Sequence, residues 1–192
     1  MIQGIIFDMD GTLTKPNMDF GALISEIGVV MNEAVLEYME RVDEKERVRV
    51  NSILERFEAR AAENAELNDG ARELLDFVVK KGKKTSLLTR NSRRSVDAVL
   101  RKHNLKFDYI VSREDARPKP SPDPVLLIGR KLGIEPAHLL VVGDYKFDVL
   151  CGKAAGAKTA LLYNHQEYDA GVMPDFKLTK LTDLIPILTY LY

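Results

Sequence analysis

Two aspartates one residue apart, Asp8 and Asp10, follow an apolar run at residues 2–7 near the N-terminus. Such a run is typical of a buried strand, and side chains at positions i and i+2 of an extended chain point to the same side. Both carboxylates are therefore expected to face one small volume at the strand end. Two acids this close repel each other unless a cation or a shared proton lies between them. The alternative is an Asx turn that only closes a strand, because Asp-Gly is a common turn dipeptide.

The strands predicted further along the chain end beside more polar side chains. Apolar strands at residues 85–89 and 139–142 alternate with amphipathic helices, a pattern typical of an open parallel sheet covered by helices on both faces. Ligands of such sheets bind at the carboxyl ends of the strands. Polar residues from distant parts of the chain should therefore converge at one edge, and they are Asp8, Asp10, Thr89, Asn91, Lys119, Asp144 and Asp148.

The chemistry of this set favours a metal-assisted phosphate site. Several carboxylates in one cleft require a divalent cation, and hard oxygen ligands point to Mg²⁺. Asp144 is the natural partner of Asp8 in holding the ion. Asp148, one helical turn later, is either a further ligand or a residue that fixes Lys119. A lysine, a hydroxyl and the amides of a helix N-terminus suit a phosphoryl group, to which an ionised Asp8 can be the nucleophile and Asp10 the general acid and base.

Residues 17–66 have a different character from the rest of the chain. They contain no convincing strand, and helices are expected at Phe20–Ile27, at residues 33–41 and around an amphipathic stretch. The apolar residues of that stretch recur with helical spacing, and they are Val50, Ile53, Leu54, Phe57 and Ala61. We expect this segment to form a small all-helical cap that rests as a lid on a core made of residues 1–16 and 67–192.

Bulk composition limits the class of protein and its partners. The net charge of −1 gives no reason to expect nucleic acid or an anionic membrane as a partner. The one cysteine, Cys151, excludes an internal disulfide and fits a reducing compartment. The sequence has no apolar run of membrane-spanning length and no leader-like N-terminus. A cytoplasmic protein is expected, with its oligomeric state left open.

The candidate residues also fall into four motifs that occur in a particular order. They are Asp8-Met9-Asp10-Gly11-Thr12, then Leu87-Leu88-Thr89-Arg90-Asn91, then Lys119 within the proline-rich residues 118–124, and finally Gly143-Asp144 with Asp148. In this ordered set the chain resembles the haloacid dehalogenase (HAD) superfamily of phosphotransferases over nearly its whole length. The resemblance points to the phosphoglycolate phosphatase and β-phosphoglucomutase branch, which has a Rossmann-like core and a cap inserted after the first motif.

The resemblance implies a role for each acid of the first and last motifs. Asp8 would be the nucleophile and Asp10 the acid/base, and Mg²⁺ would be held by Asp8, the backbone carbonyl of Asp10 and Asp144. Members that cleave carbon–halogen bonds lack an acid at the position of Asp10, because they work without metal and protonate no alkoxide. Asp10 therefore favours phosphoryl transfer.

The second and third motifs imply the phosphate-binding residues. Thr89 and Lys119 would hold the phosphoryl oxygens, and the neighbouring Arg90 and Asn91 are further candidates. Arg90 departs from the family pattern, which has a small residue or an asparagine after the motif threonine. Its side chain either contacts the substrate or points to solvent.

The function expected from these residues is a Mg²⁺-dependent phosphatase that hydrolyses a small phosphomonoester through an aspartyl-phosphate on Asp8. A phosphomutase shares the same core chemistry and differs only in the acceptor of the phosphoryl group. A non-catalytic phospho-switch or binding module is the alternative from another class. In receiver domains, however, the acid pair precedes a separate phospho-accepting aspartate, and that order differs from the one found here. The substrate itself is left open.

Overall fold

A single sheet of six parallel strands organises the residues that the computed structural model describes, which are 1–29, 34–163 and 173–190. The strand order is β3-β2-β1-β4-β5-β6. The strands are β1 (Gly4–Phe7), β2 (Lys84–Leu88), β3 (Tyr109–Val111), β4 (Leu139–Gly143), β5 (Lys158–Leu162) and β6 (Phe176–Leu178). β1 pairs in register with β2 on one side and with β4 on the other. The parallel α/β fold predicted from the sequence is thus confirmed.

Both faces of the central strands are buried, because successive side chains of a strand point to opposite sides. Ile5 and Phe7 of β1 belong to one apolar cluster, and Ile6 between them belongs to another. The same alternation divides Leu140 from Val141 in β4. The continuous apolar runs noted in the sequence are therefore strands covered on both faces.

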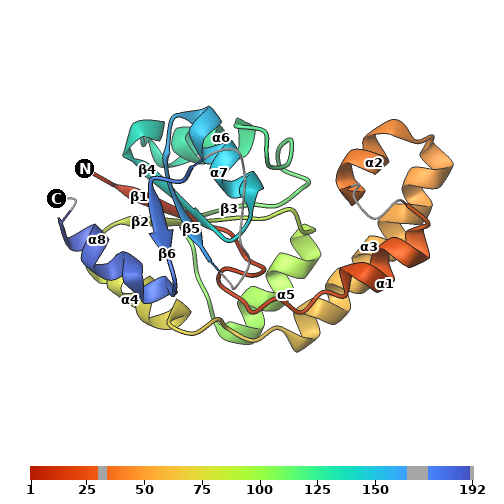
Figure 1. Ribbon diagram of the computed structural model, residues 1–192, viewed down its shortest axis with the longest axis horizontal. Helices are drawn as coiled ribbons and strands as arrows, with labels where there is room; N and C mark the ends of the chain where they lie inside the picture. Colours follow the sequence, from red (N-terminus) through yellow and green to blue (C-terminus); the bar gives the residue numbers. More distant parts are fainter. Residues whose placement is uncertain (30–33, 164–172, 191–192) are drawn as a thin grey trace.

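Helices cover the two faces of the sheet (Figure 1). One face packs on α4 (Ala71–Lys80), α5 (Arg93–His103) and α8 (Leu184–Tyr190), and the other packs on α6 (Asp123–Leu132) and α7 (Lys146–Ala155). Short 3₁₀ turns, η1 (Pro136–His138) and η2 (Leu181–Asp183), precede β4 and α8. Along the described residues, no helix combines the length and the apolar character that crossing a membrane would need.

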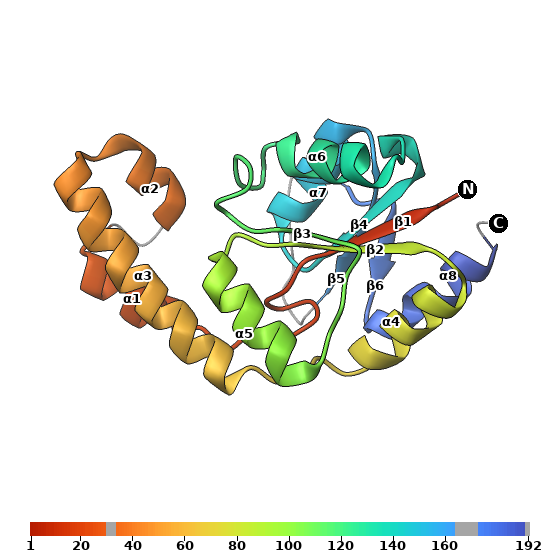
Figure 2. The same ribbon diagram turned by 180° about the vertical axis from the view of Figure 1, so that it is seen from behind.

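Three helices between the first and second strands share an apolar cluster of their own. They are α1 (Phe20–Ile27), α2 (Val35–Arg41) and α3 (Glu44–Asn64), and the buried members of their cluster are Leu23, Ile27, Val50, Ile53 and Leu54. α1 begins after Asp19, whose carboxylate accepts from the backbone N–H of Ala22, and it ends at Gly28 in a left-handed conformation. α1 and α3 run side by side away from the sheet, and the end of α3 packs on α5 (Figure 2). Of the helix predicted at residues 33–41, residue 33 lies outside the described residues.

The start of α5 is defined by local sequence signals, and it adjoins the edge of the sheet. Ser92 is the N-cap, since its hydroxyl accepts from the backbone N–H of Ser95. The basic residues of the last turn, Arg101, Lys102 and His103, complement the negative end of the helix dipole. The N-terminus of α5 therefore lies only a few residues after the end of β2.

Truncation of a central core residue should measure how far the sheet depends on packing from both sides. Leu140 is fully buried in β4, and Leu140→Ala is expected to reduce the free energy of unfolding by about 2–5 kcal/mol, because the cavity cannot collapse between two packed layers. Val79→Ala, at an exposed position of α4, is the matched control and should change it by less than about 0.5 kcal/mol. Urea unfolding followed by circular dichroism gives both values. Equal effects of the two substitutions would contradict the layered core.

Candidate active site

Three neighbouring strands end beside the polar residues singled out in the sequence. Asp8 follows β1, Thr89 follows β2 and Asp144 follows β4. Because β1 lies between the other two and all three are parallel and in register, their carboxyl ends meet at one edge. This edge of the sheet is the candidate active site.

Lys119 connects two of the acids at this edge. Its Nζ lies 2.6 Å from Oδ1 of Asp8 and 2.6 Å from Oδ1 of Asp148, and it donates to the carbonyl oxygen of Leu88 at 3.3 Å. Burial alone would lower the pKa of Lys119, but the carboxylates of Asp148 and Asp8 outweigh it and raise that pKa above its ordinary value. The buried lysine is therefore a fixed positive charge.

A cluster of carboxylates surrounds this ammonium group. Oxygen atoms of Asp8, Asp144 and Asp148 all lie within 4.8 Å of one another. Burial raises the pKa of Asp8 well above its usual range, with Lys119 opposing the rise and the other two acids adding to it. Burial and the nearby Asp148 likewise raise the pKa of Asp144 to about 6. Hard oxygen donors this close together, with Asp144 left without a lysine contact among the described residues, fit the requirements of Mg²⁺.

The sequence left open whether Asp148 is a metal ligand or a residue that fixes Lys119. One of its oxygens contacts the ammonium of Lys119, and the other accepts the backbone N–H of Tyr145 at 3.1 Å. Both contacts suit a residue that positions the lysine. Gly143 makes room for this side chain, since a Cβ at residue 143 would lie 2.0 Å from the Asp148 carboxyl carbon.

The carboxyl of Asp10 has partners of its own. It accepts from Nδ2 of Asn91 at 2.6 Å and from the hydroxyl of Thr14 at 3.1 Å. Burial raises the pKa of Asp10, and the hydrogen bonds from Asn91 and Thr14 oppose that rise. The chain can pass so close to Asp144 after Asp10 because the next residue is Gly11, at φ +80°, where a Cβ would lie 2.0 Å from an oxygen of Asp144.

The residues after β2 form a tight turn into α5. The hydroxyl of Thr89 accepts the backbone N–H of Asn91 at 3.2 Å, and both side chains are buried. The guanidinium of Arg90 donates to both oxygens of Glu37 in α2, at 2.9 and 2.6 Å, and also to the carbonyl oxygen of Lys119. It also lies 4.8 Å from the ring centre of Phe147. The side chain of Arg90 therefore points toward α2 and not into solvent, and it links the edge of the sheet to that helix.

Two residues of this neighbourhood were not among the sequence candidates. Glu37 gave no signal, because it is one acid among many on a short helix. Glu58 of α3, which accepts from Ser92, did give one: it has helical spacing from Leu54 and Ala61, on the apolar side of the helix. A charged residue at an otherwise apolar position of a helix indicates a buried partner.

Comparison with known proteins agrees with the fold and with the family expected from the sequence. A family model described as haloacid dehalogenase-like hydrolase matches residues 16–162. A haloacid dehalogenase-like hydrolase domain-containing protein of Arabidopsis thaliana is 31% identical in an alignment that covers 95% of this chain and 82% of that protein. The pyrophosphatase PpaX of Bacillus cereus is 29% identical in an alignment that covers 98% of this chain and 97% of that protein.

A solved structure shows the same fold. The crystal structure of a predicted phosphoglycolate phosphatase from Haemophilus somnus superposes with a TM-score of 0.76 at 19% identity, over 97% of this chain and 98% of that one. The family resemblance read from the sequence motifs is thus confirmed. This chain belongs to the haloacid dehalogenase-like hydrolases.

Proposed function

We propose that this hydrolase is a Mg²⁺-dependent phosphatase that acts on a small phosphomonoester through an aspartyl-phosphate on Asp8. The observation that carries the proposal is the position of Asp8, at the end of β1 and within one buried cluster with Lys119, Asp144 and Asp148. The names of the relatives, a pyrophosphatase and a phosphoglycolate phosphatase, support phosphate esters or anhydrides as the substrate class.

The metal would be held by Asp8, Asp144 and the backbone carbonyl of Asp10. The closeness of the Asp8 and Asp144 carboxylates supports this assignment, and Asp148 would keep Lys119 in place from the second layer around the site. When bound, Mg²⁺ supplies positive charge that offsets repulsion between a carboxylate nucleophile and an anionic phosphoryl group.

The reaction would proceed in two displacements. An oxygen of Asp8 attacks phosphorus while the bond to the leaving oxygen breaks, and Asp10 donates a proton to that oxygen. Asp10 then takes a proton from water as the water oxygen attacks phosphorus, which releases inorganic phosphate and restores Asp8. The raised pKa of Asp10 supports its first role, because a buried carboxyl holds its proton at higher pH.

The phosphoryl oxygens would be bound by groups of the second and third motifs. Thr89 and Lys119 supply a hydroxyl and an ammonium, and Asn91 and Arg90 supply N–H donors next to the positive end of α5. Arg90 now forms a bidentate ion pair with Glu37, so a phosphoryl group would compete with Glu37 for the guanidinium.

We further propose that residues 17–66 form a cap on a core of residues 1–16 and 67–192. The separate apolar cluster of α1 and α3 supports this division, as does the ion pair from Glu37 to Arg90. A pocket between the two parts supports a role for the cap in binding the leaving group. Its walls come from both of them, namely Leu36, Met39, Glu40, Arg47, Arg113 and Pro118.

Replacement of the nucleophile should abolish turnover and leave the fold intact. Asp8→Asn removes the charge that attacks phosphorus, and hydrolysis of p-nitrophenyl phosphate is expected to fall by at least about 10³-fold. Asp76→Asn, at an exposed position of α4, is the control and should keep full activity. Retention of wild-type turnover by folded Asp8→Asn would exclude the proposed mechanism.

Metal removal should have an equally clear result. Dialysis against EDTA is expected to abolish hydrolysis of p-nitrophenyl phosphate, and added Mg²⁺ should restore it. Asp144→Asn removes a proposed ligand charge and should raise the Mg²⁺ concentration for half-maximal activity by about 10-fold or more. Full activity of the metal-free protein would contradict the assignment of these acids.

The competition between Glu37 and the substrate can be measured as a change in KM. Glu37→Gln leaves Arg90 without its ion-pair partner, so the KM for p-nitrophenyl phosphate should fall about 2- to 10-fold, because the guanidinium becomes available to the phosphoryl group. Glu26→Gln in α1, which removes an acid from an exposed ion pair with Arg56, is the control, with an unchanged KM. A higher KM for Glu37→Gln would instead indicate that the ion pair itself supports substrate binding.

A further inference from the structure

The peptide group between Asn91 and Ser92 is held from both sides by residues outside the proposed catalytic set. Its N–H, from Ser92, donates to Oε2 of Glu58 at 3.1 Å. Its carbonyl oxygen, from Asn91, accepts the backbone N–H of Arg113 at 3.1 Å. Because a peptide group is planar, hydrogen bonds at both of its polar atoms restrict its orientation.

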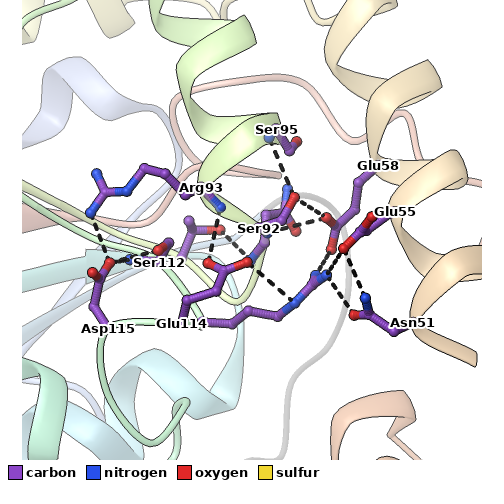
Figure 3. Close-up of polar contacts among 12 residues, drawn as sticks. Asn51, Glu55, Glu58, Ser92, Arg93, Ser95, Ser112, Glu114 and Asp115 are labelled. Carbon is purple, nitrogen blue, oxygen red and sulfur yellow. Dashed lines mark hydrogen bonds and ion pairs between the residues drawn. The ribbon is translucent and has the colours of Figure 1, made fainter. Parts of the chain in front are cut away.

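The two residues that hold this peptide group are also bonded to each other. The guanidinium of Arg113 donates to Oε1 of Glu58 and, at 3.1 Å, to Oδ1 of Asn51, while the hydroxyl of Ser92 donates to Oε2 of Glu58 at 2.6 Å. Figure 3 shows Glu58 reaching from α3 toward Ser92 at the start of α5. Glu58 is 1% exposed and the side chain of Arg113 is 9% exposed. Burial raises the pKa of Glu58, and the bonds from Arg113 and Ser92 oppose that rise.

This peptide group is part of the backbone from which the Asn91 side chain extends. Asn91 uses Nδ2 to donate to Oδ2 of Asp10 at 2.6 Å, and Asp10 is the proposed acid/base. We propose that Glu58 and Arg113 form a peptide clamp, a pair of positioning residues that hold Asn91 so that the Asp10 carboxyl is aimed at the leaving oxygen. This inference rests on the proposed function. It assigns the stem of the cap, α3, a part in proton transfer.

A purely structural role for Glu58 would have different consequences. Glu58 lies where α3 packs on α5, so a tie between two helices would affect stability alone. The clamp, however, grips the backbone of the residue that bonds Asp10. A loosened clamp should therefore weaken proton donation to the leaving group more than it weakens any other step.

The test compares two esters that differ in their need for a proton. p-Nitrophenolate leaves readily without protonation, whereas phenolate leaves less readily and gains more from a general acid. Glu58→Gln keeps the size of the side chain and replaces one acceptor oxygen by an NH₂ group. For this variant, kcat/KM for phenyl phosphate should fall about 10- to 100-fold, and that for p-nitrophenyl phosphate less than about 3-fold.

Matched variants separate positioning from structure. Glu55→Gln removes a charge from the same helix, 3.9 Å from Arg113, and should leave the ratio of the two kcat/KM values unchanged. Asn91→Ala should change the ratio as Glu58→Gln does, and the double variant should add nothing further, because both act through one hydrogen bond. If Glu58→Gln does not fold, Ser92→Ala removes the hydroxyl that donates to Glu58 and also caps α5, and it leaves the Ser92 N–H bond to Glu58 in place. This variant should shift the ratio in the same direction by a smaller factor.

The outcomes distinguish the clamp from the function on which it rests. An unchanged ratio of the two kcat/KM values in folded Glu58→Gln, including an equal loss on both esters, would overturn the clamp and leave the phosphatase proposal standing. Where Glu58→Gln fails to fold, the same result in folded Ser92→Ala would overturn it. Wild-type protein that hydrolyses neither ester in the presence of Mg²⁺ would overturn the proposed function and the clamp with it.

Discussion

The contact on which the site depends is a buried ammonium group held between two buried carboxylates. Lys119 lies 2.6 Å from both Asp8 and Asp148, and all three residues are less than a tenth exposed. An unpaired charge at this depth would cost several kcal/mol, so each member is tolerated only because the others are present. Asp144 is the acid of the cluster that this lysine does not contact in the described residues, and it is the one for which a bound cation would matter most.

The parallel sheet explains why the acids meet at all. β1, β2 and β4 are adjacent and in register, so the first residue beyond each strand reaches the same edge. Lys119 enters from the loop after β3, and Asp148 enters from the first turn of α7. Under the proposed function, strand ends would therefore supply the reactive and metal-binding groups, and loops and helix starts would supply the groups that position them. Ligand sites of open parallel sheets are expected at the carboxyl ends of the strands.

The helical segment holds the turn between β2 and α5 at two points. Glu37 of α2 engages the side chain of Arg90, and Glu58 of α3 engages the backbone of Ser92. The residues that would bind phosphate therefore lie between two acids that belong to one helical segment.

Local patterns in the sequence were enough to predict the parallel sheet and the helices that cover both of its faces. The spacing of Asp8 and Asp10 after an apolar strand, and the helical spacing of Val50, Ile53 and Leu54, involve only residues a few positions apart. The ion pair of Arg90 with Glu37 joins residues 53 positions apart, and the bond from Ser92 to Glu58 spans 34. Periodicity indicates that Glu58 is buried but does not identify its partner, since such pairs arise only when packed helices bring distant side chains together. Tertiary packing alone thus decided where Arg90 points and how the Asn91–Ser92 peptide group is held.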